Sequence, residues 1–218
     1  MTTIASGFML ATSLLLAAPS WAQLYESASS LDLTTLTFTG VGVTLTPQNQ
    51  MQGSTLNDGT GFGGVRQEDA LATHAFTPQS WVTATSSVGF DSIGNATAIA
   101  DSSQFSVHAA SYGAGHLDSF VERSGLLRAT SAGLLTISVN YTVAHSAIST
   151  NLATALAGWG GPQLVLGDQV AHGVSLNPVG SQAALDAHGT LSVTRAFAAG
   201  ETVSFDLRTE TAQSVPIP

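Results

Sequence analysis

Apolar and polar residues alternate with a period of two along several stretches of the chain. The clearest stretch runs from Leu135 to His145, where the odd positions are Leu, Ile, Val, Tyr, Val and His, while the even positions are mostly hydroxyl or amide residues. A β-strand turns successive side chains to opposite faces of a sheet. The pattern therefore predicts a strand with one buried face.

The end of the chain repeats this alternation in two neighbouring runs. Leu191, Val193, Arg195 and Phe197 form the first run, and residues 203–208 form the second. Between them lies the turn sequence Ala-Ala-Gly-Glu at 198–201. Two alternating runs joined by a short glycine-containing turn predict a β-hairpin.

A change of phase marks the segment from Leu36 to Leu45. Its apolar residues first occupy even positions and then odd ones, with Gly40 at the change. A bulge or a sharp bend at Gly40 would bring both halves onto one face.

The remaining signals complete an all-β prediction. About eight strands with polar turns favour a two-sheet β-sandwich of jelly-roll-like architecture. Helices are expected to be short at most, at Asn151–Ala157 and Ser181–Ala187, and residues 47–79 are expected to form one long irregular loop. The further strands predicted are Trp81–Phe90, Ala96–Ala100, Gln104–His108, Gly125–Ala129 and Gln163–Val174.

The beginning of the chain predicts export. Phe8 to Ala18 form an apolar run followed by Pro19 and Ser20-Trp21-Ala22, which is typical of a signal peptide over residues 1–22 with a mature start at Gln23. The run is shorter than the about twenty apolar residues that a membrane span needs. A buried N-terminal helix is the alternative. Residues 23–218 have the length of a single domain.

Composition narrows the classes of partner. The chain has no Cys, five Lys+Arg against fourteen Asp+Glu, and a formal net charge of −9. Disulfides, thiolate metal sites and cysteine catalysis are therefore excluded, and nucleic acid or anionic membranes would be repelled. The glycine-rich run at 59–64 has neither the spacing nor the Lys of a phosphate-binding loop, so no cofactor is implied.

One group of titratable residues could carry chemistry. His108, His116, Asp118 and Glu122 are close in sequence, and imidazole and carboxylate groups can bind zinc or transfer protons. A polar turn around His116 is the ordinary alternative. No Gly-x-Ser-x-Gly nucleophile motif accompanies them.

Aromatic residues offer a second kind of site. Trp81, Tyr112 and Trp159 lie near expected loops, and exposed rings on a β-sandwich can stack on sugar rings. Packing of the same rings in the core or at its rim is the alternative.

The last residues carry a resemblance. Val215-Pro216-Ile217-Pro218 resembles the start of the sorting signal of PEP-CTERM proteins, which are exported by Gram-negative bacteria. In that family an apolar helix and an Arg-rich end follow, and this sequence lacks both. The resemblance implies a secreted or cell-surface protein that an exosortase sorts, often in bacteria with an exopolysaccharide matrix. It implies no catalytic residue.

These observations favour a non-enzymatic exported protein with a structural, adhesive or matrix role, in contact with polysaccharide or other envelope proteins. A glycan-binding module that uses the three aromatic residues is one alternative. A secreted hydrolase that uses the His/Asp/Glu group is another. A spacer or filament subunit whose edge strands pair with neighbouring copies is a further structural interpretation.

Overall fold

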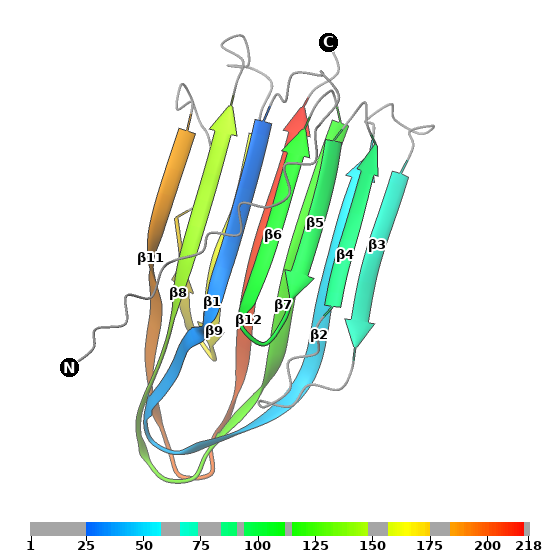
Figure 1. The fold of residues 1–218 in the computed structure, drawn as a ribbon. Coiled ribbons are helices and arrows are strands. Elements are labelled where there is room, and N and C mark those ends of the chain that lie inside the picture. Colours follow the sequence, from blue (N-terminus) through cyan, green and yellow to red (C-terminus); the bar gives the residue numbers. More distant parts are fainter. Residues whose placement is uncertain are drawn as a thin grey trace, which may run out of the picture.

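A computed structural model describes residues 25–57, 66–73, 84–90, 94–111, 115–147, 157–174 and 184–215. These ranges form twelve strands in two packed sheets (Figure 1). They contain no helix, and hence none long and apolar enough to cross a membrane. The predicted all-β, two-sheet sandwich is confirmed.

Both sheets are six-stranded and antiparallel. Sheet A has the order β11 (Ala184–Phe197), β8 (Gly133–Ala147), β1 (Tyr25–Gly40), β6 (Gln104–Ser111), β5 (Gly94–Ala100) and β4 (Ala84–Phe90). Sheet B has the order β10 (Gln169–His172), β9 (Ala157–Leu166), β12 (Thr202–Val215), β7 (Gly115–Ala129), β2 (Val43–Asn57) and β3 (Arg66–Thr73).

Within the described residues, three connections carry the chain from one sheet to the other at the lower end of Figure 1. They join β1 to β2, β7 to β8 and β11 to β12. The predicted hairpin at 191–208 is therefore wrong, because β11 and β12 lie in opposite sheets and pair with β8 and with β7 and β9 instead. The turn between them is held by a hydrogen bond of 2.9 Å from the Gly200 N–H to the Ala129 carbonyl.

The bend predicted at Gly40 is confirmed. β1 ends at Gly40, which has a φ of +115°, and the chain then crosses to sheet B. The Val41 N–H donates to the Leu134 carbonyl at 2.9 Å, which joins this crossover to the neighbouring one. The change of phase in the sequence thus marks a change of sheet.

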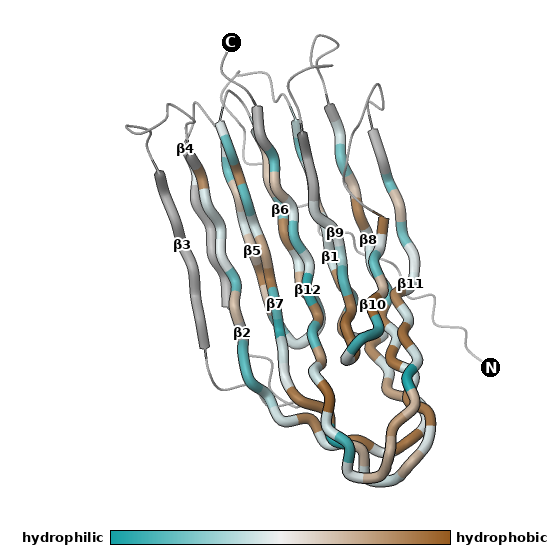
Figure 2. Tube along the Cα trace, turned by 180° about the vertical axis from the view of Figure 1, so that it is seen from behind, coloured by the Kyte–Doolittle hydropathy of each residue, from teal (hydrophilic) through white to brown (hydrophobic). Residues whose placement is uncertain are grey.

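The interior between the two sheets is apolar near the crossovers and polar towards the opposite end of the sandwich. Figure 2 shows hydrophobic residues concentrated near the crossovers. The main apolar cluster includes Leu31, Phe105, Leu135, Ile137, Leu164 and Phe205, all at most 1% exposed. Burial of this apolar surface is the main favourable term in folding.

Beyond that core, buried hydroxyl and amide groups connect the sheets. Thr209 Oγ1 donates to Ser29 Oγ at 2.6 Å, and Gln213 Nε2 donates to Ser27 Oγ at 2.7 Å. Ser27 Oγ also contacts Thr211 Oγ1. Buried polar groups cost stability unless they are hydrogen-bonded, and these contacts meet that requirement across the sandwich.

Several predicted element bounds need correction. The expected loop at 47–79 is partly strand, because β2 extends to Asn57 and β3 spans Arg66–Thr73. The expected helix at 181–187 is wrong over its described part, since residues 184–187 begin β11. Of the helix expected at 151–157, only Ala157 is described, and it begins β9.

Candidate functional site

The four predicted metal or catalytic residues lie on two different sheets. His108 is in β6 of sheet A, whereas His116, Asp118 and Glu122 are in β7 of sheet B. His108 Nε2 lies 2.7 Å from Glu26 Oε1 on β1. In the part of the chain that the structure describes, no three His, Asp or Glu side chains are grouped to hold a metal ion.

The other sequence predictions fall mostly outside the described residues. Trp81, Tyr112 and the signal peptide over 1–22 are not among them. Trp159 is described only as a backbone position in β9, opposite Ala212 of β12. The glycan-binding platform therefore stays a prediction.

Sheet B carries a charged cluster on its outer face. On β7 the residues between Leu117 and Arg123 alternate between buried and half-buried, so Asp118 and Glu122 face away from the core. On β12 the same side is occupied by Asp206, Arg208 and Glu210, and Arg208 lies opposite Glu122 in the ladder. We call Asp118, Glu122, Asp206, Arg208 and Glu210 the acidic cluster.

Arg208 is the central cation of the acidic cluster. Its Nη2 donates to Glu210 Oε2, and its Nη1 lies 3.8 Å from Glu122 Oε2. Its guanidinium carbon lies 5.9 Å from the centre of the Phe120 ring, within the range of a cation–π interaction. One guanidinium cannot neutralise four carboxylates, so protonation of some of them is favoured.

Asp206 is the carboxyl group most affected. Burial, then the negative charge of Glu122, raises the pKa of Asp206 to about 7, and a hydrogen bond with Glu122 adds to this effect. The pKa of Asp118 is also raised, by burial and then by Glu210. Near neutral pH, Asp206 can thus keep a proton that an exposed carboxyl group would have lost.

Sequence reasoning found two members of this cluster and missed the others. Asp118 and Glu122 were recognised by residue type, whereas Asp206, Arg208 and Glu210 were not singled out. Asp206 and Arg208 occupy the polar positions of the run predicted at 203–208, and this pattern indicates that both side chains lie on the outer face of a sheet. Their position beside β7 depends on the pairing of β12, which no local pattern contains.

A shallow pocket borders the acidic cluster. It has a volume of about 330 Å³, and its lining includes Gln163, His172, Arg208 and Glu210. Gly160 and Gly161 of β9 complete one wall. The pocket therefore offers amide, imidazole, guanidinium and carboxylate groups to a polar ligand.

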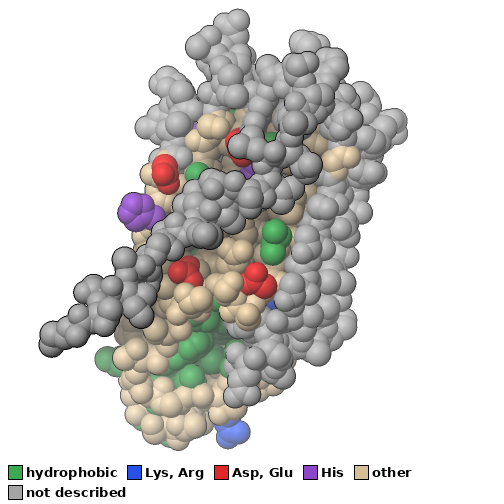
Figure 3. Space-filling view, in the orientation of Figure 1, with side chains coloured by type: hydrophobic (Ala, Val, Ile, Leu, Met, Phe, Trp, Pro, Cys, Tyr) green, Lys and Arg blue, Asp and Glu red, His purple; other side chains and the backbone are tan. Residues whose placement is uncertain are grey.

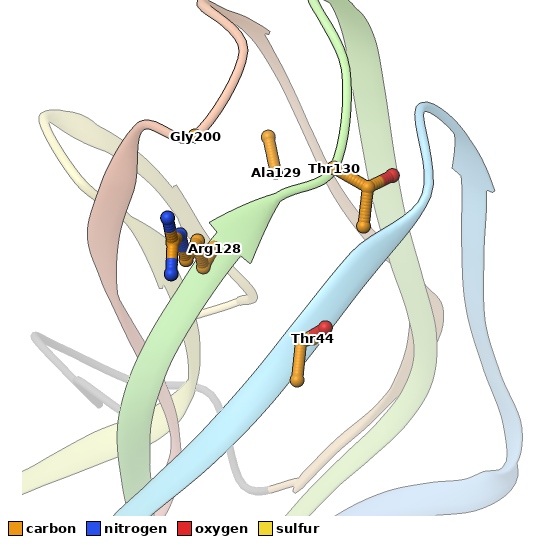
Figure 4. Close-up of a pocket in the computed structure, with 5 residues that line it drawn as sticks. All are labelled: Thr44, Arg128, Ala129, Thr130 and Gly200. Atoms are coloured by element: carbon orange, nitrogen blue, oxygen red, sulfur yellow. The ribbon is translucent and has the colours of Figure 1, made fainter.

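A second pocket of about 330 Å³ lies near the crossovers (Figure 4). Thr44, Arg128, Ala129, Thr130 and Gly200 line it. Figure 4 shows Arg128 on β7 and Thr44 on β2 at its side. With one guanidinium and two hydroxyl groups, this pocket carries no acid–base pair.

The outer face of sheet A has a different character, with hydroxyl and amide groups in ranks across β11, β8 and β1. The first rank is Thr194, Thr136 and Thr39, and the second is Ser192, Ser138 and Thr37. Asn140 and Thr190 begin a third rank. We call these eight residues the hydroxyl face.

Hydrogen bonds link these side chains between strands. Thr136 Oγ1 and Thr194 Oγ1 lie 2.8 Å apart, as do Thr37 Oγ and Ser138 Oγ. Thr190 Oγ1 donates to Asn140 Oδ1 at 2.7 Å. Figure 3 shows uncharged polar side chains and backbone over much of this side of the molecule, together with a hydrophobic patch in its lower part and a few acidic side chains.

Comparisons of the chain with protein-family models, with curated proteins and with solved structures find no match. The two outer faces therefore supply the chemistry from which a function can be proposed. The hydroxyl face is extended and its eight side chains are uncharged, although its third rank meets Asp32 of β1 opposite Asn140, whereas the acidic cluster is compact and carries one cation.

Proposed function

We propose that this protein is a non-enzymatic extracellular or cell-surface β-sandwich with an adhesive or matrix role in contact with neutral polysaccharide. The hydroxyl face is the observation that carries the proposal. Its ranks extend over three adjacent strands, and most of its side chains are exposed to solvent.

The chemistry of the hydroxyl face matches that of a sugar polymer. Ser and Thr hydroxyls both donate and accept hydrogen bonds, as sugar hydroxyls do. Neighbouring strands are about 4.8 Å apart, so the ranks repeat regularly across the sheet. Threonine is stiff at χ1, which lowers the entropy lost on binding.

The strength of single contacts favours a polymer over a small sugar. A net hydrogen bond in water contributes only about 0.5–1.5 kcal/mol, so useful affinity requires many contacts at once. A long chain with repeated hydroxyls supplies them through multivalency. The net charge of −9 favours a neutral polymer over an acidic one. The predicted signal peptide and the resemblance to PEP-CTERM proteins support an extracellular setting.

The test is co-sedimentation of the mature protein with insoluble neutral polysaccharides such as cellulose and β-1,3-glucan. The double variant Thr136→Val and Thr194→Val is expected to weaken binding about 30-fold, because two hydroxyls of about 1 kcal/mol each are lost while shape and strand propensity are kept. Added salt should have little effect, since this contact is uncharged.

A matched control lies on the other sheet. Thr44 and Thr202 flank Arg128 on the outer face of sheet B, and both are exposed. Their double change to Val removes the same atoms and should leave binding unchanged. Equal loss in both double variants, or no binding by the parent protein to any neutral polymer, would contradict the proposal.

A second candidate function is glycoside or ester hydrolysis at the acidic cluster. The specific observation is Asp206, whose pKa is raised to about 7 by burial, by the charge of Glu122 and by a hydrogen bond with that residue. Two carboxyl groups that share a hydrogen bond can act as a proton-sharing dyad in acid–base hydrolysis. The adjacent pocket has room for a small polar substrate.

Any hydrolysis at this pair should be sensitive to Asp206. The Asp206→Asn variant is expected to lose about 100-fold or more in rate, and the parent activity should fall as pH rises above about 7, when Asp206 loses its proton. A chromogenic glycoside and ester panel would measure this. Activity that persists in Asp206→Asn, or a panel with no turnover, would eliminate this candidate.

A further inference from the structure

Arg123 is a cation inside the sandwich. It lies on β7 at an inward position and is 0% exposed. Among the described residues no carboxylate forms an ion pair with it, and burial is the cause of the lowering of its pKa to about 9. An isolated buried charge costs several kcal/mol, so a compensating group is expected.

One side of the Arg123 guanidinium is fixed by the protein. Nη1 donates to the Glu122 carbonyl at 2.9 Å and to the Met51 carbonyl at 3.3 Å. The Phe105 ring centre lies 5.1 Å from the guanidinium carbon. These contacts fix the plane of the guanidinium but do not involve the edge formed by Nε and Nη2.

Among the described residues, the other edge meets no hydrogen-bond acceptor. The Nε and Nη2 atoms of Arg123 are buried, and neither donates a hydrogen bond to any described residue. The N–H groups on these two atoms point in parallel from one edge of the planar guanidinium. This is the fork that binds the two oxygens of a carboxylate or a phosphate.

Gln52 presents unpartnered groups in the same layer. It is on β2, beside β7, and is 1% exposed. The register places it opposite Val121, one inward position away from Arg123. Neither its Nε2 nor its Oε1 has a partner among the described residues.

The strand that faces them carries small side chains. β5 packs across β2 and β7, and its inward positions are Gly94, Ala96, Ala98 and Ala100. Figure 1 shows β5 in front of this part of sheet B. Sheets in a sandwich lie about 10 Å apart, so alanine leaves more of that distance to Arg123 and Gln52 than a larger residue would.

We propose that Arg123 and Gln52 form an internal site for one small carboxylate or oxyanion, bound by the Nε and Nη2 edge of Arg123 and by the amide of Gln52. Such an anion satisfies two orphan donors and supplies the missing negative charge. Buried water could satisfy the donors without supplying the charge. This inference is independent of the proposed polysaccharide contact.

The test uses the mature protein, dialysed into a buffer free of small carboxylates and oxyanions. Thermal unfolding is then followed during titration with sodium formate, sodium acetate or sodium phosphate, against sodium chloride at matched ionic strength. We expect at least one of these anions to raise Tm with saturation, as ligand linkage requires, and ion chromatography to find about one anion released per unfolded chain.

Variants assign the effect to the site. Arg123→Met should abolish the anion-dependent rise in Tm. Gln52→Met should weaken the apparent affinity for the anion about tenfold. This second variant keeps the inference testable if Arg123→Met does not fold. Arg128→Met, which removes an exposed guanidinium from the same strand, should leave the rise unchanged. If the parent protein shows no saturable rise in Tm and releases no anion, the inference is overturned in favour of buried water. If the rise in Tm is unaffected by Gln52→Met, the inference is overturned in favour of anion binding at the surface.

Discussion

Replacing Gly40 with alanine is expected to destabilise the protein by about 3–4 kcal/mol. The φ of +115° at Gly40 is a conformation that residues with a side chain rarely adopt. An added Cβ would lie 2.0 Å from the Leu134 carbonyl oxygen, closer than any van der Waals contact allows. That oxygen accepts the hydrogen bond from Val41, so relief of the clash disturbs two crossovers together.

Urea unfolding of Gly40→Ala and of the parent protein measures this change. Gly89→Ala is the matched control, because Gly89 is exposed in β4 without a positive φ and its added Cβ would meet Asn95 Cβ at an ordinary 3.4 Å. The control should be within about 0.5 kcal/mol of the parent or slightly more stable. A Gly40→Ala protein as stable as the control would show that the crossover has another conformation.

The Asp206→Asn variant is expected to be more stable than the parent at neutral and alkaline pH, by roughly 2–4 kcal/mol at pH 8. The pKa of Asp206 is raised to about 7 in the folded protein, above its ordinary value of 3.8. From about pH 4 to about pH 7 the folded state therefore binds the proton that the unfolded state has lost. Parent stability should fall through this window and then level off.

Denaturant unfolding between about pH 4 and pH 8 tests whether the stability of the parent protein falls as pH rises. The advantage of Asp206→Asn should be near zero at pH 4 and grow towards pH 8. Asp168 provides a control of opposite sign, since its hydrogen bond from Arg195 lowers its pKa. Asp168→Asn should lose stability at neutral pH and match the parent in acid. A pH-independent difference for Asp206→Asn would contradict the assignment of its raised pKa.

The strands with apolar inward positions were predictable, and those with polar inward positions were not. Alternation at 135–145 predicted β8 because Leu135, Ile137 and Val139 all face the core. β12 runs to Val215, beyond the predicted run at 203–208, because Thr209 and Thr211 face inward yet are polar. Their burial depends on partners from β1 that are far away in the sequence.

The candidate sites were likewise predictable from residue type only in part, and the rest depended on contacts between distant segments. Residue type was enough to single out Asp118 and Glu122, but it also joined them to His108, which the fold places on the opposite sheet. Arg208 enters the acidic cluster only through its register opposite Glu122. Arg123 would ordinarily be expected at the surface because of its charge, although it shares the alternating phase of the buried Val121 and Leu127.

By itself, the sequence determined the period of two, the bend at Gly40, the absence of cysteine and the acidic charge, because each depends on a residue or its near neighbours. Tertiary structure alone decided that β11 and β12 pair in different sheets, which side chains meet on each outer face, and that Arg123 lies inside. The physical reason is that strand pairing and burial are contacts between distant segments. Ser27 and Thr211 meet across the sandwich although 184 positions separate them in the chain.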